Sequence, residues 1–140
     1  MTAAEPRWLR VFVASVGICF LLWLLAVGKP PRPTLFWYEI YNLGHIPLFG
    51  LIALLALEFS RGLSASPATG QVTHYLAAFV MVALISLVSE ILQLGVEGRE
   101  AEVQDAVHNL IGAICFLAIR SGFDSSLWSE RNGPQRGFLM

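Results

Sequence analysis

Four long apolar runs fill most of this chain and limit what it can fold into. They cover residues 11–27, 43–59, 75–96 and 103–119. Each run is close to the roughly 20 residues that a helix, rising about 1.5 Å per residue, needs to cross the roughly 30 Å hydrocarbon layer of a membrane. Four such runs in succession predict an all-α membrane protein, a bundle of four transmembrane helices.

The composition agrees with a lipid environment. Of the 140 residues, 56 % are hydrophobic and only 14 % are charged, and the mean hydropathy is +0.64. A soluble domain of this size leaves a large share of its residues exposed to water, so it cannot hide that much apolar surface. The net charge of −1 provides no basic field, and we expect no nucleic-acid partner. Cys19 and Cys115 lie inside apolar runs and are expected to be small buried hydrophobic residues.

The segments between the runs indicate one transmembrane domain over residues 1–120, followed by a polar C-terminal tail over residues 121–140 that is loosely ordered or lies on the membrane surface. Residues 28–33 read GKPPRP, which a helix cannot continue through. The connection at residues 97–102 is short, so the last two spans are expected to form an antiparallel hairpin. No small-x-small cleavage site follows the first run, which we interpret as a retained span rather than a signal peptide.

The distribution of Lys and Arg predicts how the bundle sits in the cell membrane. With four spans, the N-terminus, the second loop and the C-terminus share one side, which holds Arg7, Arg10, Arg61, Arg120, Arg131 and Arg136. The opposite side holds Lys29, Arg32 and Arg99. The positive-inside rule therefore places both termini in the cytoplasm and the first and third loops outside.

Polar residues gather at the outer level of three spans. They are Asn42 and His45 on the second span, Ser86, Glu90, Gln93 and Glu97 on one face of the third, and Asp105, His108 or Asn109, and Gly112 on one face of the fourth. An antiparallel hairpin brings the end of the third span level with the start of the fourth, so these faces are expected to meet at one depth. Charged groups inside a membrane are costly, and they usually pair or line a functional cavity.

This polar pattern resembles that of the VanZ-like family, whose founding member is associated with resistance to the glycopeptide teicoplanin. The similar residues are Glu90-x-x-Gln93, Gly98-Arg99 and Asp105-x-x-x-Asn109-x-x-Gly112, together with His45 at the start of the second span. Phe49 stands where the family commonly has a tyrosine. The resemblance covers the second to fourth spans. It implies a small polytopic membrane protein and a link to glycopeptide resistance.

The polar residues predict a site for an amphiphilic envelope molecule, which would be a membrane lipid, a lipid-linked glycan or a lipoglycopeptide. In this interpretation Arg99 contacts a phosphate or carboxylate through its forked guanidinium group. Glu90 and Asp105 orient Arg99 and accept hydrogen bonds. The remaining polar wall consists of His45, Gln93 and Asn109.

Two other interpretations stay open. Glu90 or His45 could act as the acid or base of an intramembrane enzyme on a lipid headgroup, although no G-x-S-x-G nucleophile elbow is present. The same residues could instead form a structural network in a partner-binding subunit, because polar groups hold membrane helices together. The spacing of the histidines and carboxylates matches no zinc motif, so we expect no metal site and no cofactor. The sequence does not identify a protein partner.

Overall fold

The computed structural model describes residues 6–27, 34–64, 69–93 and 103–132, and over these ranges the chain forms four helices and no strand. The helices are α1 (Arg7–Val27), α2 (Leu35–Leu63), α3 (Gln71–Gln93) and α4 (Val103–Asn132). Each contains a stretch that is long and apolar enough to cross a membrane. The predicted all-α fold with four transmembrane helices is therefore confirmed.

The helices are longer than the apolar runs that predicted them. α2 begins at Leu35, directly after Thr34 in an extended conformation. The largest difference is in α4, which continues past residue 119 to Asn132. Residues 121–132 are helical rather than loosely ordered, whereas a location of the tail on the membrane surface stays a prediction. Polar contacts hold the helix at Asp124. The Asp124 carboxylate accepts hydrogen bonds from Arg61 and Tyr75, on α2 and α3.

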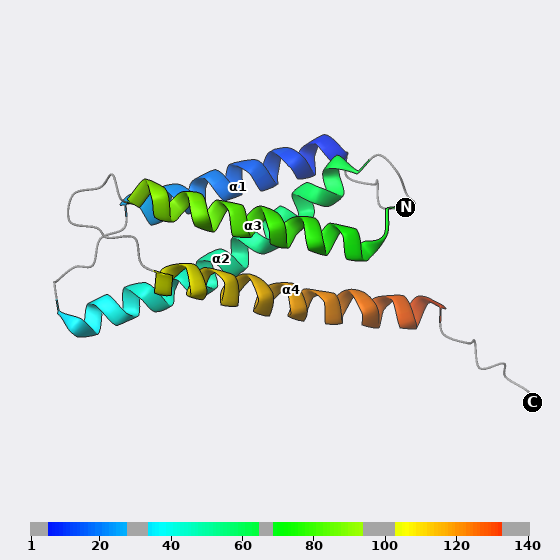
Figure 1. Cartoon of the computed structure of the whole chain (residues 1–140). Helices are drawn as coiled ribbons and strands as arrows, with labels where there is room; N and C mark the ends of the chain where they lie inside the picture. Colours follow the sequence, from blue (N-terminus) through cyan, green and yellow to red (C-terminus); the bar gives the residue numbers. More distant parts are fainter. Residues whose placement is uncertain (1–5, 28–33, 65–68, 94–102, 133–140) are drawn as a thin grey trace, which may run out of the picture.

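The helix α2 is the centre of the bundle. It packs against α1, α3 and α4, and α3 also packs against α4. In Figure 1, α2 runs obliquely across the other three helices. The start of α1 and the end of α4 lie at one end of the bundle, whereas the start of α2, the end of α3 and the start of α4 lie at the other end (Figure 1).

One face of α2 builds most of the apolar core. Its members recur at helical spacing and are at most 1 % exposed: Phe49, Ile52, Ala53, Ala56 and Leu57. The other three helices add Leu25, Ala78, Val82, Ala113 and Leu117. Several of these residues are alanines. Small residues let membrane helices approach closely, which favours packing where lipid removes the hydrophobic force between helices.

The outer surface of the bundle is apolar on all four helices. Exposed large apolar side chains include Phe12, Phe20, Trp23, Leu51, Leu84 and Ile114. Soluble proteins rarely expose contiguous apolar surface of this kind, whereas lipid tails solvate it. Cys19 and Cys115 belong to this surface, so the prediction that they are buried is wrong. In a bundle solvated by lipid, an apolar run supplies the outward face as well as the core.

Candidate functional site

The buried polar side chains gather at one end of the bundle. Among the described residues, every buried polar or charged side chain belongs to this group, which we call the polar cluster: Asn42, His45, Ser86, Ser89, Glu90, Asp105 and Asn109. They come from the start of α2, the end of α3 and the start of α4, which meet at the same end of the bundle (Figure 1). The structure therefore brings the three helix segments together as predicted. Ser89 was not among the predicted residues, and the location of the cluster at the outer level of the membrane stays a prediction.

A chain of hydrogen bonds joins these three helices. The Asn109 amide nitrogen donates to Ser86 Oγ at 2.9 Å, and Asn109 Oδ1 lies 2.9 Å from His45 Nδ1. Since the Asn109 amide oxygen can only accept, His45 Nδ1 carries the hydrogen. The lone pair of a neutral His45 ring is then on Nε2. Asn109 is fully buried, so it fixes both the orientation and the tautomer of the histidine.

Two buried carboxylates lie beside the histidine. His45 Nε2 is 3.8 Å from Asp105 Oδ2. One ligand atom each from His45, Glu90 and Asp105 lies within 4.8 Å of those of the other two. Asp105 is in the first turn of α4, where the partial positive charge of the helix N-terminus stabilises an anion. Three ionisable side chains from three helices thus face one small volume inside the bundle.

Gly112 sets the distance between α2 and α4 next to the cluster. A Cβ atom at this position would collide with the carbonyl oxygen of Ile46. Gly112 therefore permits backbone contact between the two helices. On α2 the contact is at Ile46, one residue after His45, and on α4 it is three residues after Asn109. The glycine in the family-like pattern has a packing role that supports the hydrogen bond between His45 and Asn109.

The structure brings together four of the six predicted site residues: His45, Glu90, Asp105 and Asn109. Gln93 is the last residue of α3, and its side chain lies outside the described part, as does Arg99. Ser86 was placed on the face of Glu90 by its four-residue spacing, but its bond to Asn109 was not predicted. His108 is half-buried and is not part of the converging group.

A second set of polar contacts connects the helices at the opposite end of the bundle, and the sequence did not predict it. We call it the ionic network: Arg10, Glu58, Arg61, Gln71, Tyr75, Arg120 and Asp124. Asp124 lies at its centre. It accepts hydrogen bonds from Arg61 and from the Tyr75 hydroxyl at 2.7 Å, and it forms an ion pair with Arg120 at 3.2 Å. The Arg61 guanidinium also lies 5.7 Å from the centroid of the Tyr75 ring. These contacts connect all four helices.

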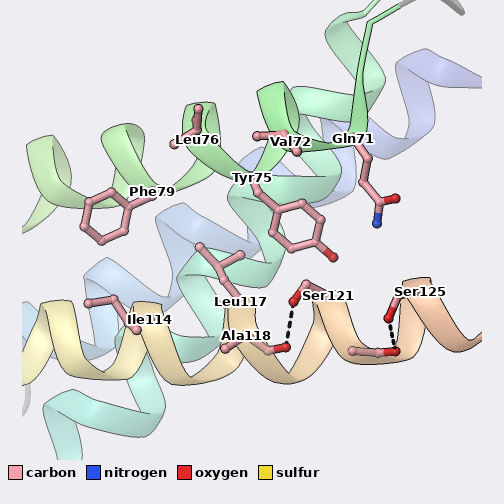
Figure 2. Close-up of a pocket in the computed structure, with 11 residues that line it drawn as sticks. Gln71, Val72, Tyr75, Leu76, Phe79, Ile114, Leu117, Ala118, Ser121 and Ser125 are labelled. Atoms are coloured by element: carbon pink, nitrogen blue, oxygen red, sulfur yellow. Dashed lines mark hydrogen bonds between the residues drawn. The ribbon is translucent and has the colours of Figure 1, made fainter.

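A groove of about 650 Å³ runs between α3 and α4. Figure 2 shows Phe79 and Ile114 toward one end, and Gln71 and Ser125 at the other. The groove borders the ionic network through Tyr75, and none of its lining residues belongs to the polar cluster. Its walls are mainly apolar, as expected of a surface that contacts lipid tails.

The fold and the site together define a class of protein. Four apolar helices, a lipid-compatible surface and polar side chains confined to the interior and the ends describe a multi-pass membrane protein. A family model described as VanZ/LLP1 matches residues 6–123, and the chain belongs to the VanZ/LLP1 family. This result confirms the resemblance found from the polar pattern. No curated protein and no solved structure is significantly similar to the chain.

Proposed function

We propose that the polar cluster engages an amphiphilic envelope molecule, which is a membrane lipid, a lipid-linked glycan or a lipoglycopeptide. The observation that carries the proposal is the concentration of buried polar side chains, two carboxylates included, at one end of an otherwise apolar bundle. Carboxylates are a costly choice if helix adhesion is their only role, because uncharged Ser or Asn side chains would serve.

The individual roles follow from the sequence and the described geometry. In the sequence, Arg99 falls between the end of α3 at Gln93 and the start of α4 at Val103. In the proposal it binds a phosphate or carboxylate of the ligand bidentately. Glu90 and Asp105 orient Arg99, and the polar wall is completed by His45, Gln93 and Asn109. The bond between His45 and Asn109 keeps that wall rigid before the ligand arrives.

The proposed location is the cell membrane, with the polar cluster in the outer leaflet. The start of α1 and the end of α4 lie at the same end of the bundle (Figure 1), so these two helix ends belong on one side of the membrane. The excess of arginine on that side supports a cytoplasmic location. A pocket in the outer leaflet would meet glycopeptides and lipid-linked precursors directly, which supports a role in glycopeptide resistance.

An intramembrane enzyme is the second candidate. It is favoured by the closeness of His45, Glu90 and Asp105, since an imidazole and carboxylates can exchange protons with a headgroup and a water molecule. The two functions differ in what Glu90→Gln does. The variant keeps the size and polarity of the side chain but cannot take up a proton. In an enzyme it abolishes turnover and leaves ligand binding in place.

The proposal is tested in cells that depend on the protein for growth with teicoplanin. Replacing the chromosomal copy by Arg99→Ala or by Glu90→Gln should increase susceptibility, because each change removes a group that contacts or orients the ligand. Glu39→Gln is the matched control, since Glu39 is an exposed glutamate near the start of α2. Its susceptibility should equal that of the wild type. Membrane abundance and thermal stability of each variant are measured in parallel.

Full resistance in cells that contain either Arg99→Ala or Glu90→Gln would refute the proposed binding role. Loss of resistance together with loss of the protein from the membrane would instead indicate a structural network. In that case the function would lie in a partner protein, and the polar cluster would serve only to hold α2, α3 and α4 together.

A further inference from the structure

Three side chains with metal-binding atoms meet inside the bundle. His45, Glu90 and Asp105 come from α2, α3 and α4, and each offers one ligand atom within 4.8 Å of the other two. The exposed fractions of the three residues are only 1 %, 7 % and 6 %. An imidazole nitrogen and carboxylate oxygens are the ligands that Zn²⁺ and related divalent ions take in proteins. The short-range spacing of zinc motifs could not reveal this group, because each ligand lies on a different helix.

The ring of His45 already has the orientation and the tautomer that a metal ligand needs. Its Nδ1–H is directed at Asn109 Oδ1, and Asn109 is itself fixed by its bond to Ser86. Histidines that bind metals almost always donate a hydrogen bond through the N–H group of one ring nitrogen, and the other ring nitrogen coordinates the ion. The hydrogen bond orients the ring. The other ring nitrogen, His45 Nε2, lies 3.8 Å from Asp105 Oδ2.

The distances fit an ion between the ligands. With bonds of about 2.1 Å and tetrahedral angles, two ligand atoms on a zinc ion lie about 3.4 Å apart. His45 Nε2 and Asp105 Oδ2 are 3.8 Å apart, which is longer than a hydrogen bond and close to that separation. The third ligand, Glu90, offers a carboxylate oxygen within 4.8 Å of the ligand atoms of the other two residues. A divalent ion would also balance the charge of two carboxylates in a low-dielectric interior.

We infer that His45, Glu90 and Asp105 bind one divalent transition-metal ion of the Zn²⁺ or Mn²⁺ type. Three protein ligands leave at least one coordination position open for water or for a phosphate or carboxylate of a ligand. Each carboxylate has two oxygens, so each can coordinate the ion through one of them. The metal site does not depend on the proposed envelope ligand, because it is tested with the metal ion alone.

The test is metal binding by the purified full-length protein in detergent. Cys19 and Cys115 are exposed thiols that would bind zinc on their own, so both are first replaced by alanine. The protein is then equilibrated with Zn²⁺, and separately with Mn²⁺, against a chelator that buffers the free ion. Bound metal is measured by elemental mass spectrometry. We expect one equivalent of at least one of the two ions per chain.

Two substitutions remove ligands and a third removes their support. Glu90→Gln and Asp105→Asn should each weaken binding at least tenfold, and Asn109→Leu, which removes the acceptor for His45 Nδ1–H, should weaken it about tenfold to a hundredfold. His108→Gln is the matched control. It removes a histidine beside Asn109 that is outside the converging group, and its affinity should equal that of the parent.

The inference is overturned if the folded parent protein binds less than a stoichiometric amount of both ions, or if Glu90→Gln and Asp105→Asn bind metal as tightly as the parent. If these variants do not fold, X-ray absorption of the metal-loaded parent decides the question. An imidazole and oxygen ligands in the first coordination sphere support the site, and an ion surrounded by water alone overturns it. A parent protein that binds neither ion would overturn the metal site and leave the envelope-ligand proposal unaffected.

Discussion

The substitution Gly112→Ala should destabilise the bundle more than the addition of a methyl group at any other position of α4. The new Cβ would collide with the carbonyl oxygen of Ile46, which is backbone and cannot rotate away. The helices α2 and α4 must then separate, which also stretches the bond between His45 and Asn109. Overpacking of this kind costs about 1–3 kcal/mol in well-packed cores, and we expect the upper end of that range here. Thermal denaturation in detergent measures the effect.

Gly122→Ala is the control on the same helix. A Cβ atom there has nothing within 4 Å, and alanine favours a helix over glycine by about 0.5–1 kcal/mol. This variant should be as stable as the wild type or slightly more stable. Equal melting temperatures for Gly112→Ala and Gly122→Ala would show that α2 and α4 are not in backbone contact at this position.

Asp124→Ala should give the second large effect. The carboxylate accepts hydrogen bonds from Arg61, Tyr75 and Gln71, and it also pairs with Arg120. The side chains of Asp124 and Arg61 are only 13 % and 19 % exposed, so water cannot fully replace the lost acceptor. Hydrogen bonds to charged groups contribute about 1.5–3 kcal/mol each, and we expect a net loss of about 2–3 kcal/mol. The end of α4 should also become more sensitive to protease.

The variant Asp124→Asn distinguishes the contribution of the negative charge to stability from the contribution of the hydrogen bonds. The amide oxygen still accepts from Arg61 or Tyr75, so this variant should lose less stability than Asp124→Ala. Ser125→Ala is the control for the exposed face of the same turn, because Ser125 donates to the carbonyl oxygen of Gly122 in its own helix and, within the described ranges, has no hydrogen bond to another helix. If Asp124→Ala denatured at the temperature of Ser125→Ala, the ionic network would contribute nothing to the stability of the bundle.

The main features of the fold could be predicted because they depend on local patterns. A helix that crosses lipid needs a continuous apolar run, and four such runs were visible in the sequence. The convergence of Glu90, Asp105 and Asn109 could be predicted because a short connection forces two antiparallel helices to align. The polar face of α3 also follows from helical spacing alone, since Ser86 and Glu90 are four residues apart.

Other features depend on contacts between distant residues. The continuation of α4 to Asn132 carries no apolar signal, and it is held by partners on α2 and α3 that lie some 50 to 60 residues earlier in the chain. The hydroxyl of Tyr75 donates to Asp124, 49 residues later in the chain, which no local pattern around Tyr75 predicts. The pairing of His45 with Asn109 also joins separate helices, so the tautomer of the histidine could not be read from its neighbours in sequence.

Binding of an envelope molecule by the polar cluster is measured by native mass spectrometry of the protein released gently from membranes, with Arg99→Ala beside the wild type. We expect a defined lipid or headgroup adduct on the wild type. Loss of a bidentate phosphate contact should weaken that adduct about tenfold to a hundredfold in the variant. Asp124→Asn, at the opposite end, should keep the adduct. A wild-type protein without any bound molecule, or an adduct of equal strength on Arg99→Ala, would contradict the proposed binding.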